Sequence, residues 1–138
     1  MKRALTSLMT IAALTTLTAG VAATQSLQAN IPFTFHAGNE TLPAGTYRVS
    51  LAGTYDQLVM LRNFDSSRSM VLLPSGQTPA PHSWNRTGHP KLIFECTERC
   101  TLTKLWTGSG EPVIKIPHRS LGGDVLPAIA EVRLSRPQ

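Results

Sequence analysis

The hydrophobic pattern from residue 30 to residue 51 predicts two short strands joined by turns. Over 31–35, Ile, Phe and Phe occupy every second position, which is the period of a strand with one buried face. Gly38-Asn39 then provides residues that accept positive φ in a tight hairpin turn. Leu-Pro-Ala-Gly at 42–45 follows the preference of a type I turn, and the alternation resumes over 47–51. We interpret every notable residue of this stretch as having a folding role.

Further strands are expected at intervals of about ten residues along the rest of the chain. The apolar or alternating segments are 57–64, 69–73, a hairpin over 91–106, 112–116 and 130–134. Residues 75–90 have no clear period and are rich in proline, so we predict a loop there, and 127–129 could begin a short helix. This spacing predicts an all-β fold, a single-domain antiparallel β-sandwich or barrel of about seven to eight short strands.

The first residues have the pattern of an export signal. Lys2 and Arg3 precede an uncharged run rich in Ser and Thr, which ends in the small residues Val21-Ala22-Ala23. We predict a signal peptide over 1–23 and one β-rich domain over 24–138, located in the periplasm or outside the cell. A second candidate cleavage site follows Ala29, and an uncleaved N-terminal anchor is the alternative, although the hydroxyl groups make the run a poor membrane span.

Charge and cysteine content narrow the classes of function. Without Lys2 and Arg3, the 13 basic residues of the whole chain fall to a mild excess over the 8 acidic ones. Basic and aromatic residues do not interleave as single-stranded nucleic acid requires, so we expect no nucleic-acid partner. Export to an oxidising compartment predicts a disulfide between Cys96 and Cys100.

The cysteine pair also fixes the expected register of the 91–106 hairpin. A three-residue loop over 97–99 places Cys96 opposite Cys100 and Phe94 opposite Leu102. In that register Lys104 would share the face of the apolar residues, and a bulge near Thr103 removes the conflict. Because the closed loop is so short, the chain-entropy argument gives the bridge only about 2 kcal/mol, so we expect it to fix a turn.

Two motifs resemble a known group of proteins. The first is Pro32-Phe33-x-Phe35-x-x-Gly38 followed by Leu42-Pro43-Ala44-Gly45-x-Tyr47-x-Val49, and the second is Lys91-Leu92-x-Phe94 with Leu102-x-x-Leu105-Trp106. Together they resemble small, signal-peptide-bearing, β-rich proteins of acidobacteria, over about half of residues 24–138. The resemblance implies an exported β-rich domain and brings no assigned activity. The two cysteines depart from that group's pattern, which leaves open whether the disulfide is general to it.

The candidate binding residues all lie in the predicted loop over 78–90: His82, Trp84, Asn85, Arg86 and His89. Rigidly held loops often carry binding residues, and a Trp face beside Arg and Asn suits a sugar ring and its hydroxyls. The alternative interpretation is a surface loop in which Trp84 covers the end of the core. We predict no metal site, because two imidazoles lack a placed third ligand, and no cofactor motif is present.

The sequence therefore favours a non-catalytic protein. Ser109 in Gly-Ser-Gly lacks the spacing and the strand-to-helix context of a hydrolase nucleophile, and we assign no catalytic residue. We expect a binding, interaction or structural envelope protein, whose partner is an envelope protein or a carbohydrate. The alternative is a small secreted hydrolase acting on glycans, with a site in the 78–90 loop built from His82, His89 and a nearby acid.

Overall fold

The computed structural model describes residues 26–53, 58–119 and 125–137, so the predicted signal peptide lies outside the described residues. These segments form eleven strands and one short helix: β1 (Ser26–Ile31), β2 (Phe35–Ala37), β3 (Glu40–Leu42), β4 (Gly45–Ala52), β5 (Leu58–Asn63), β6 (Ser69–Leu72), β7 (Gly76–Thr78), α1 (His82–Thr87), β8 (Lys91–Cys96), β9 (Cys100–Trp106), β10 (Val113–Lys115) and β11 (Ala128–Ser135). The predicted count of seven to eight is too low, because β2, β3 and β7 have only three residues each and carry too little pattern to be recognised as separate strands.

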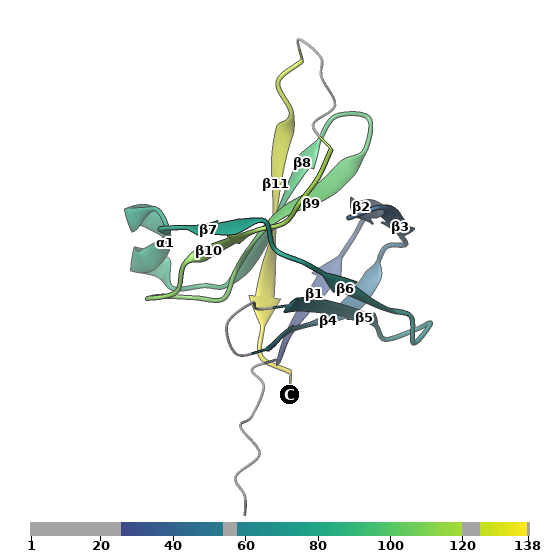
Figure 1. Cartoon of the computed structure of the whole chain (residues 1–138), viewed down its shortest axis with the longest axis horizontal. Helices are drawn as coiled ribbons and strands as arrows, with labels where there is room; N and C mark the ends of the chain where they lie inside the picture. Colours follow the sequence, from purple (N-terminus) through teal and green to yellow (C-terminus); the bar gives the residue numbers. More distant parts are fainter. Residues whose placement is uncertain (1–25, 54–57, 120–124, 138) are drawn as a thin grey trace, which may run out of the picture.

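The strands form one curled sheet in the order β3-β2-β9-β8-β11-β1-β4-β5-β6, with β10 joining β9 to β7 (Figure 1). The prediction of a mainly antiparallel β protein is confirmed, and the pairing of β2 with β9 is parallel. The long strand β11 links the two halves of the sheet, because it pairs with β8 along most of its length and with β1 at its end. The sheet curls into a half-barrel, so the two halves that pack against each other across the core belong to one sheet.

An aromatic cluster joins the two halves across the core. The ring of Phe35 lies 5.3 Å from that of Tyr47 on β4 and 5.4 Å from that of Phe94 on β8, both in edge-to-face geometry. All three residues are buried. Edge-to-face contacts between aromatic rings stabilise the fold beyond the burial of the rings themselves. Because the Phe35 ring makes such contacts with both halves of the sheet, it contributes to the packing of each.

The prediction of one strand over 31–35 is wrong in one respect, because residues 32–34 belong to no strand and separate β1 from β2. β1 ends at Ile31 beside β4, and β2 begins at Phe35 beside β9. Ile31 and Phe35 are both fully buried, and the ring of Phe33 packs 5.0 Å from that of Phe94. The alternation therefore predicted which residues enter the core, but the segment crosses from one half of the sheet to the other. Pro32, which has no N–H for a ladder, lies at this crossing.

The predicted hairpins are confirmed. The β2–β3 turn contains Gly38 at φ 59°, and a disulfide joins Cys96 to Cys100, which face each other across β8 and β9. The register shifts between Ile93 and Phe94, so that Thr103 is the extra residue of a bulge and its hydroxyl donates a hydrogen bond to the Ile93 carbonyl at 3.3 Å. The bulge turns Lys104 to the exposed face.

Two other predictions are wrong. The segment over 75–90 is not a simple loop, because β7 pairs with β10 and α1 follows it. Figure 1 shows this β7–β10 pair and α1 at one side of the molecule. The helix ends at Gly88, whose φ of 67° suits glycine and whose N–H donates to the Trp84 carbonyl at 2.9 Å. The optional helix over 127–129 is also absent, because β11 already begins at Ala128.

The turn at Gly38 yields a stability prediction. A Cβ at Gly38 would lie 3.1 Å from Leu72 Cδ2 and 3.6 Å from Met70 Cε, because the β2–β3 turn packs against β6. We expect Gly38→Ala to lower the free energy of unfolding by about 1–2 kcal/mol, because alanine is strained at positive φ and its Cβ displaces the Leu72 side chain. Urea unfolding measures this. Gly76→Ala is the control, since a Cβ there meets nothing within 4 Å; equal losses in both variants would contradict the packing argument.

Candidate functional site

Trp84 packs against the end of the core. Its ring is half-buried, lies 5.6 Å from the ring of the fully buried Trp106, and carries the Lys91 ammonium 4.6 Å from its centroid. The Trp106 indole N–H donates to the Glu111 carbonyl at 2.9 Å. This packing fits the interpretation in which Trp84 covers the core, while stacking of Trp84 on a sugar stays a prediction.

The other predicted loop residues, His82, Asn85, Arg86 and His89, are all exposed on or beside α1. His89 lines a pocket of about 370 Å³ together with Lys91, Glu131 and Arg133, and His82 is not part of its lining. The Lys91 ammonium forms an ion pair with the Glu131 carboxylate, with 3.4 Å between Nζ and Oε2. Glycoside hydrolysis ordinarily needs two carboxyl groups, and the described lining of this pocket supplies one.

The described residues contain no group of three or more His, Cys, Asp or Glu side chains close enough to hold a metal ion. Within the same segments, no helix combines the length and the apolar character needed to cross a membrane.

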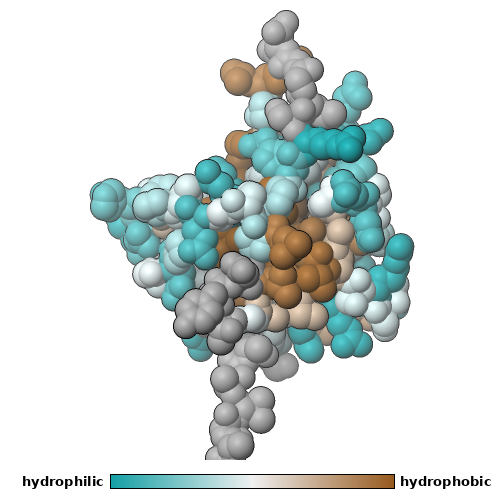
Figure 2. Space-filling view, in the orientation of Figure 1, coloured by the Kyte–Doolittle hydropathy of each residue, from teal (hydrophilic) through white to brown (hydrophobic). Residues whose placement is uncertain are grey.

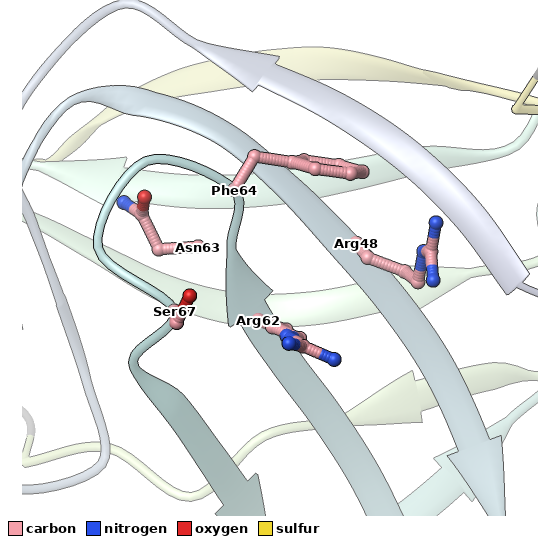
Figure 3. Close-up of a pocket in the computed structure, with 5 residues that line it drawn as sticks. All are labelled: Arg48, Arg62, Asn63, Phe64 and Ser67. Atoms are coloured by element: carbon pink, nitrogen blue, oxygen red, sulfur yellow. The ribbon is translucent and has the colours of Figure 1, made fainter.

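A second cluster, which the sequence analysis did not identify, lies on the outer face of β4 and β5. Arg48 points outward because its neighbours Tyr47 and Val49 are buried, and Arg62 does so because Leu61 and Asn63 are buried. The register places Arg48 directly opposite Arg62. Figure 3 shows both guanidinium groups on the same side of the ribbon, with Phe64 above them.

The cluster lines a small pocket. The guanidinium carbon of Arg48 lies 5.2 Å from the centroid of the Phe64 ring, in cation–π geometry. Arg48, Arg62, Phe64, Asn63 and Ser67 enclose about 210 Å³. This volume is below the roughly 300–1,000 Å³ typical of small-molecule sites, and a phosphate or carboxylate group fits within it.

The two arginines have no described carboxylate partner. Like charges directly opposite each other on neighbouring strands destabilise a sheet. The ion pairs of the described segments are Lys91–Glu131 and His118–Glu95, and neither involves Arg48 or Arg62. Among the residues that the structure describes, no carboxylate therefore forms an ion pair with either arginine of this pocket.

A tight turn after β5 holds the wall of the pocket. Asn63 is buried, and its Oδ1 accepts hydrogen bonds from the backbone N–H groups of Asp65 at 2.7 Å and Ser66 at 3.1 Å. The Phe64 N–H donates to the Thr46 carbonyl at 3.0 Å, which fixes Phe64 beside β4. Ser67 has a φ of 56° and completes the lining.

The sequence held a partial signal of this cluster. The alternation over 47–51 places Arg48 on the polar face of its strand, but only the register of β4 against β5 brings Arg62 beside it. We compared the chain with protein-family models, with curated proteins and with solved structures, and none matches it.

Proposed function

We propose that the protein is an exported, non-catalytic binding protein that holds an anionic group of its ligand between Arg48 and Arg62. The observation that carries this proposal is the facing pair of guanidinium groups without a described carboxylate partner. Arginine binds phosphate and carboxylate through two parallel N–H···O bonds, and such charge-assisted bonds are about twice as strong as neutral ones. The Phe64 ring beside Arg48 limits the directions in which that guanidinium points.

The composition of the pocket supports binding over catalysis. Its lining contains two arginines, an amide, a hydroxyl and an aromatic ring, and no histidine or carboxyl group that would serve as a general base. Ser67 consequently has no activating partner within the lining. A purely structural role leaves the facing arginines unexplained, since they cost stability.

Two features support the export part of the proposal. The Cys96–Cys100 disulfide suits an oxidising compartment. Leu27 and Ala29 are buried in β1, so cleavage after Ala29 would remove most of that strand, whereas cleavage after Ala23 keeps it whole. Burial of β1 thus favours 1–23 as the signal peptide.

Loss of one arginine tests the anion site. We expect Arg62→Gln to weaken the binding of inorganic phosphate about ten-fold, because a hydrogen bond to a charged group is worth about 1.5–3 kcal/mol. NMR titration of the arginine side-chain N–H signals measures the affinity, and a parallel titration with glucuronate compares a carboxylate with a phosphate.

The matched control is Arg99→Gln, which removes the same charge from the exposed β8–β9 turn. We expect Arg99→Gln to leave the phosphate affinity within two-fold of the unmodified protein. If both variants weaken binding equally, the attraction comes from net charge and the proposed site is wrong.

A further inference from the structure

The pocket belongs to a wider surface that carries cations and apolar side chains together. We call it the arginine face; it consists of Thr46, Arg48 and Ser50 on β4, Met60, Arg62 and Phe64 on and after β5, and Ser69, Val71 and Leu73 on and after β6. These nine positions include two arginines and no acid.

Exposed apolar side chains concentrate on this face. In the described segments seven large hydrophobic residues are at least 36% exposed, and four lie here, with Phe64 at 46% and Leu73 at 67%. The other three, Val125, Leu126 and Ile129, lie on or just before β11. Figure 2 shows a brown apolar area at the centre of the view, where β6 crosses in Figure 1. Exposed apolar groups that cluster in this way mark interaction sites.

The strand register arranges the face in rows. Met60 pairs with Ser50 on one side and Val71 on the other, and Arg62 pairs with Arg48 and Ser69. A row with apolar side chains therefore runs next to a row with two positive charges. Phe64 lies beyond the cationic row and Leu73 beyond the apolar one.

We infer that the arginine face docks on an anionic lipid surface. This inference rests on the proposed function, because the anionic group between Arg48 and Arg62 is then the phosphate of a lipid headgroup. Val71, Leu73, Met60 and Phe64 reach from the same face into the boundary between headgroups and acyl chains. Surfaces that lie at this boundary combine apolar side chains with arginine and lysine, and each cation near an anionic membrane adds to the affinity.

Charge and shape favour lipid over other occupants. A second copy of the chain placed face to face would bring two pairs of arginines together without a described acid between them, which opposes self-association. The pocket of about 210 Å³ within this face is lined by both arginines, and it admits a headgroup phosphate. An acidic protein partner is the competing outcome of the test.

Flotation of the purified protein with lipid vesicles tests the inference. We expect binding to vesicles of phosphatidylglycerol and none to vesicles of phosphatidylcholine. Arg48→Gln with Arg62→Gln should weaken binding about twenty-five-fold, at about five-fold per cation. Val71→Ser with Leu73→Ser should weaken vesicle binding about ten-fold, because less apolar surface is then buried in the membrane on binding. The control pair, Val125→Ser with Leu126→Ser, should leave it unchanged. Residues 1–25 are identical in every variant, so differences between variants report on the face.

The phosphate titration separates failure of this inference from failure of the proposed function. If phosphate binds between the arginines but vesicles do not bind, the anion site stands and lipid docking is wrong. If neither binds, both proposals are wrong. Vesicle binding that the serine pair keeps in full would also overturn the inference, because the apolar side chains would then take no part.

Discussion

Phe35→Ala is expected to lower the free energy of unfolding by about 3–5 kcal/mol, the usual cost of removing a buried phenylalanine ring. Phe35 is fully buried, and its ring contacts those of Tyr47 and Phe94 on opposite halves of the curled sheet. The substitution leaves a cavity where the two halves meet, so both lose packing at once. Denaturant unfolding followed by tryptophan fluorescence measures the loss, which is a large part of the stability of a domain of this size.

Phe64→Ala is the matched control for this prediction. It removes the same ring from the arginine face, where Phe64 is 46% exposed. We expect a loss of less than about 1 kcal/mol, because a partly exposed side chain gives up less contact with the protein. The effects on phosphate affinity should be the reverse. Phe64→Ala should weaken phosphate binding, whereas the folded Phe35→Ala protein should bind phosphate as the unmodified protein does. Similar stability losses in the two variants would contradict the central position of Phe35.

Local sequence rules predicted the parts of the fold that depend on neighbouring residues. The β8–β9 hairpin, its disulfide and its bulge at Thr103 follow from the short loop and from the face on which Lys104 must lie. The break between Ile31 and Phe35 does not follow, because the apolar alternation runs through it without interruption. Only the packing of the whole chain requires those residues to cross from β4 to β9.

The proposed binding surface was harder to predict for the same reason. The predicted binding residues His82, Trp84, Asn85, Arg86 and His89 are polar and aromatic neighbours in the sequence, and the structure places them on and beside a short helix. Arg48 and Arg62 belong to different strands, and a shift of one residue in the register would turn one of them toward the core. A site made by strand pairing leaves little trace in either strand alone.

The arginine face lies on the outer side of strands whose inner side forms part of the core. The inner sides of β4 and β5 carry the core through Tyr47, Val49 and Leu61, so the outer sides are free to carry charge. The repulsion between Arg48 and Arg62 is a cost that the packing of the inner side offsets. A bound anion removes that repulsion, and the protein should therefore be more stable in the presence of its ligand.

Asn63→Ala is expected to lower the free energy of unfolding by about 2–3 kcal/mol and to weaken phosphate binding as well. The buried Asn63 side chain accepts hydrogen bonds from the N–H groups of Asp65 and Ser66, which lose their partner in the variant. Each such lost bond costs about 1–3 kcal/mol when the remaining group is poorly solvated. The turn that positions Phe64 and Ser67 then loosens, so the pocket loses its shape together with stability. Urea unfolding and the phosphate titration measure the two effects on the same sample.

Ser66→Ala provides the comparison within the same turn. The Ser66 hydroxyl accepts only a long, exposed hydrogen bond of 3.5 Å from the Arg68 N–H, so its removal should cost less than about 0.5 kcal/mol and leave phosphate binding unchanged. An Asn63→Ala protein that loses stability but binds phosphate with full affinity would show that the turn does not shape the pocket. Loss of both properties in Asn63→Ala alone would tie the anion site to the hydrogen bonds that a single buried amide makes at the end of β5.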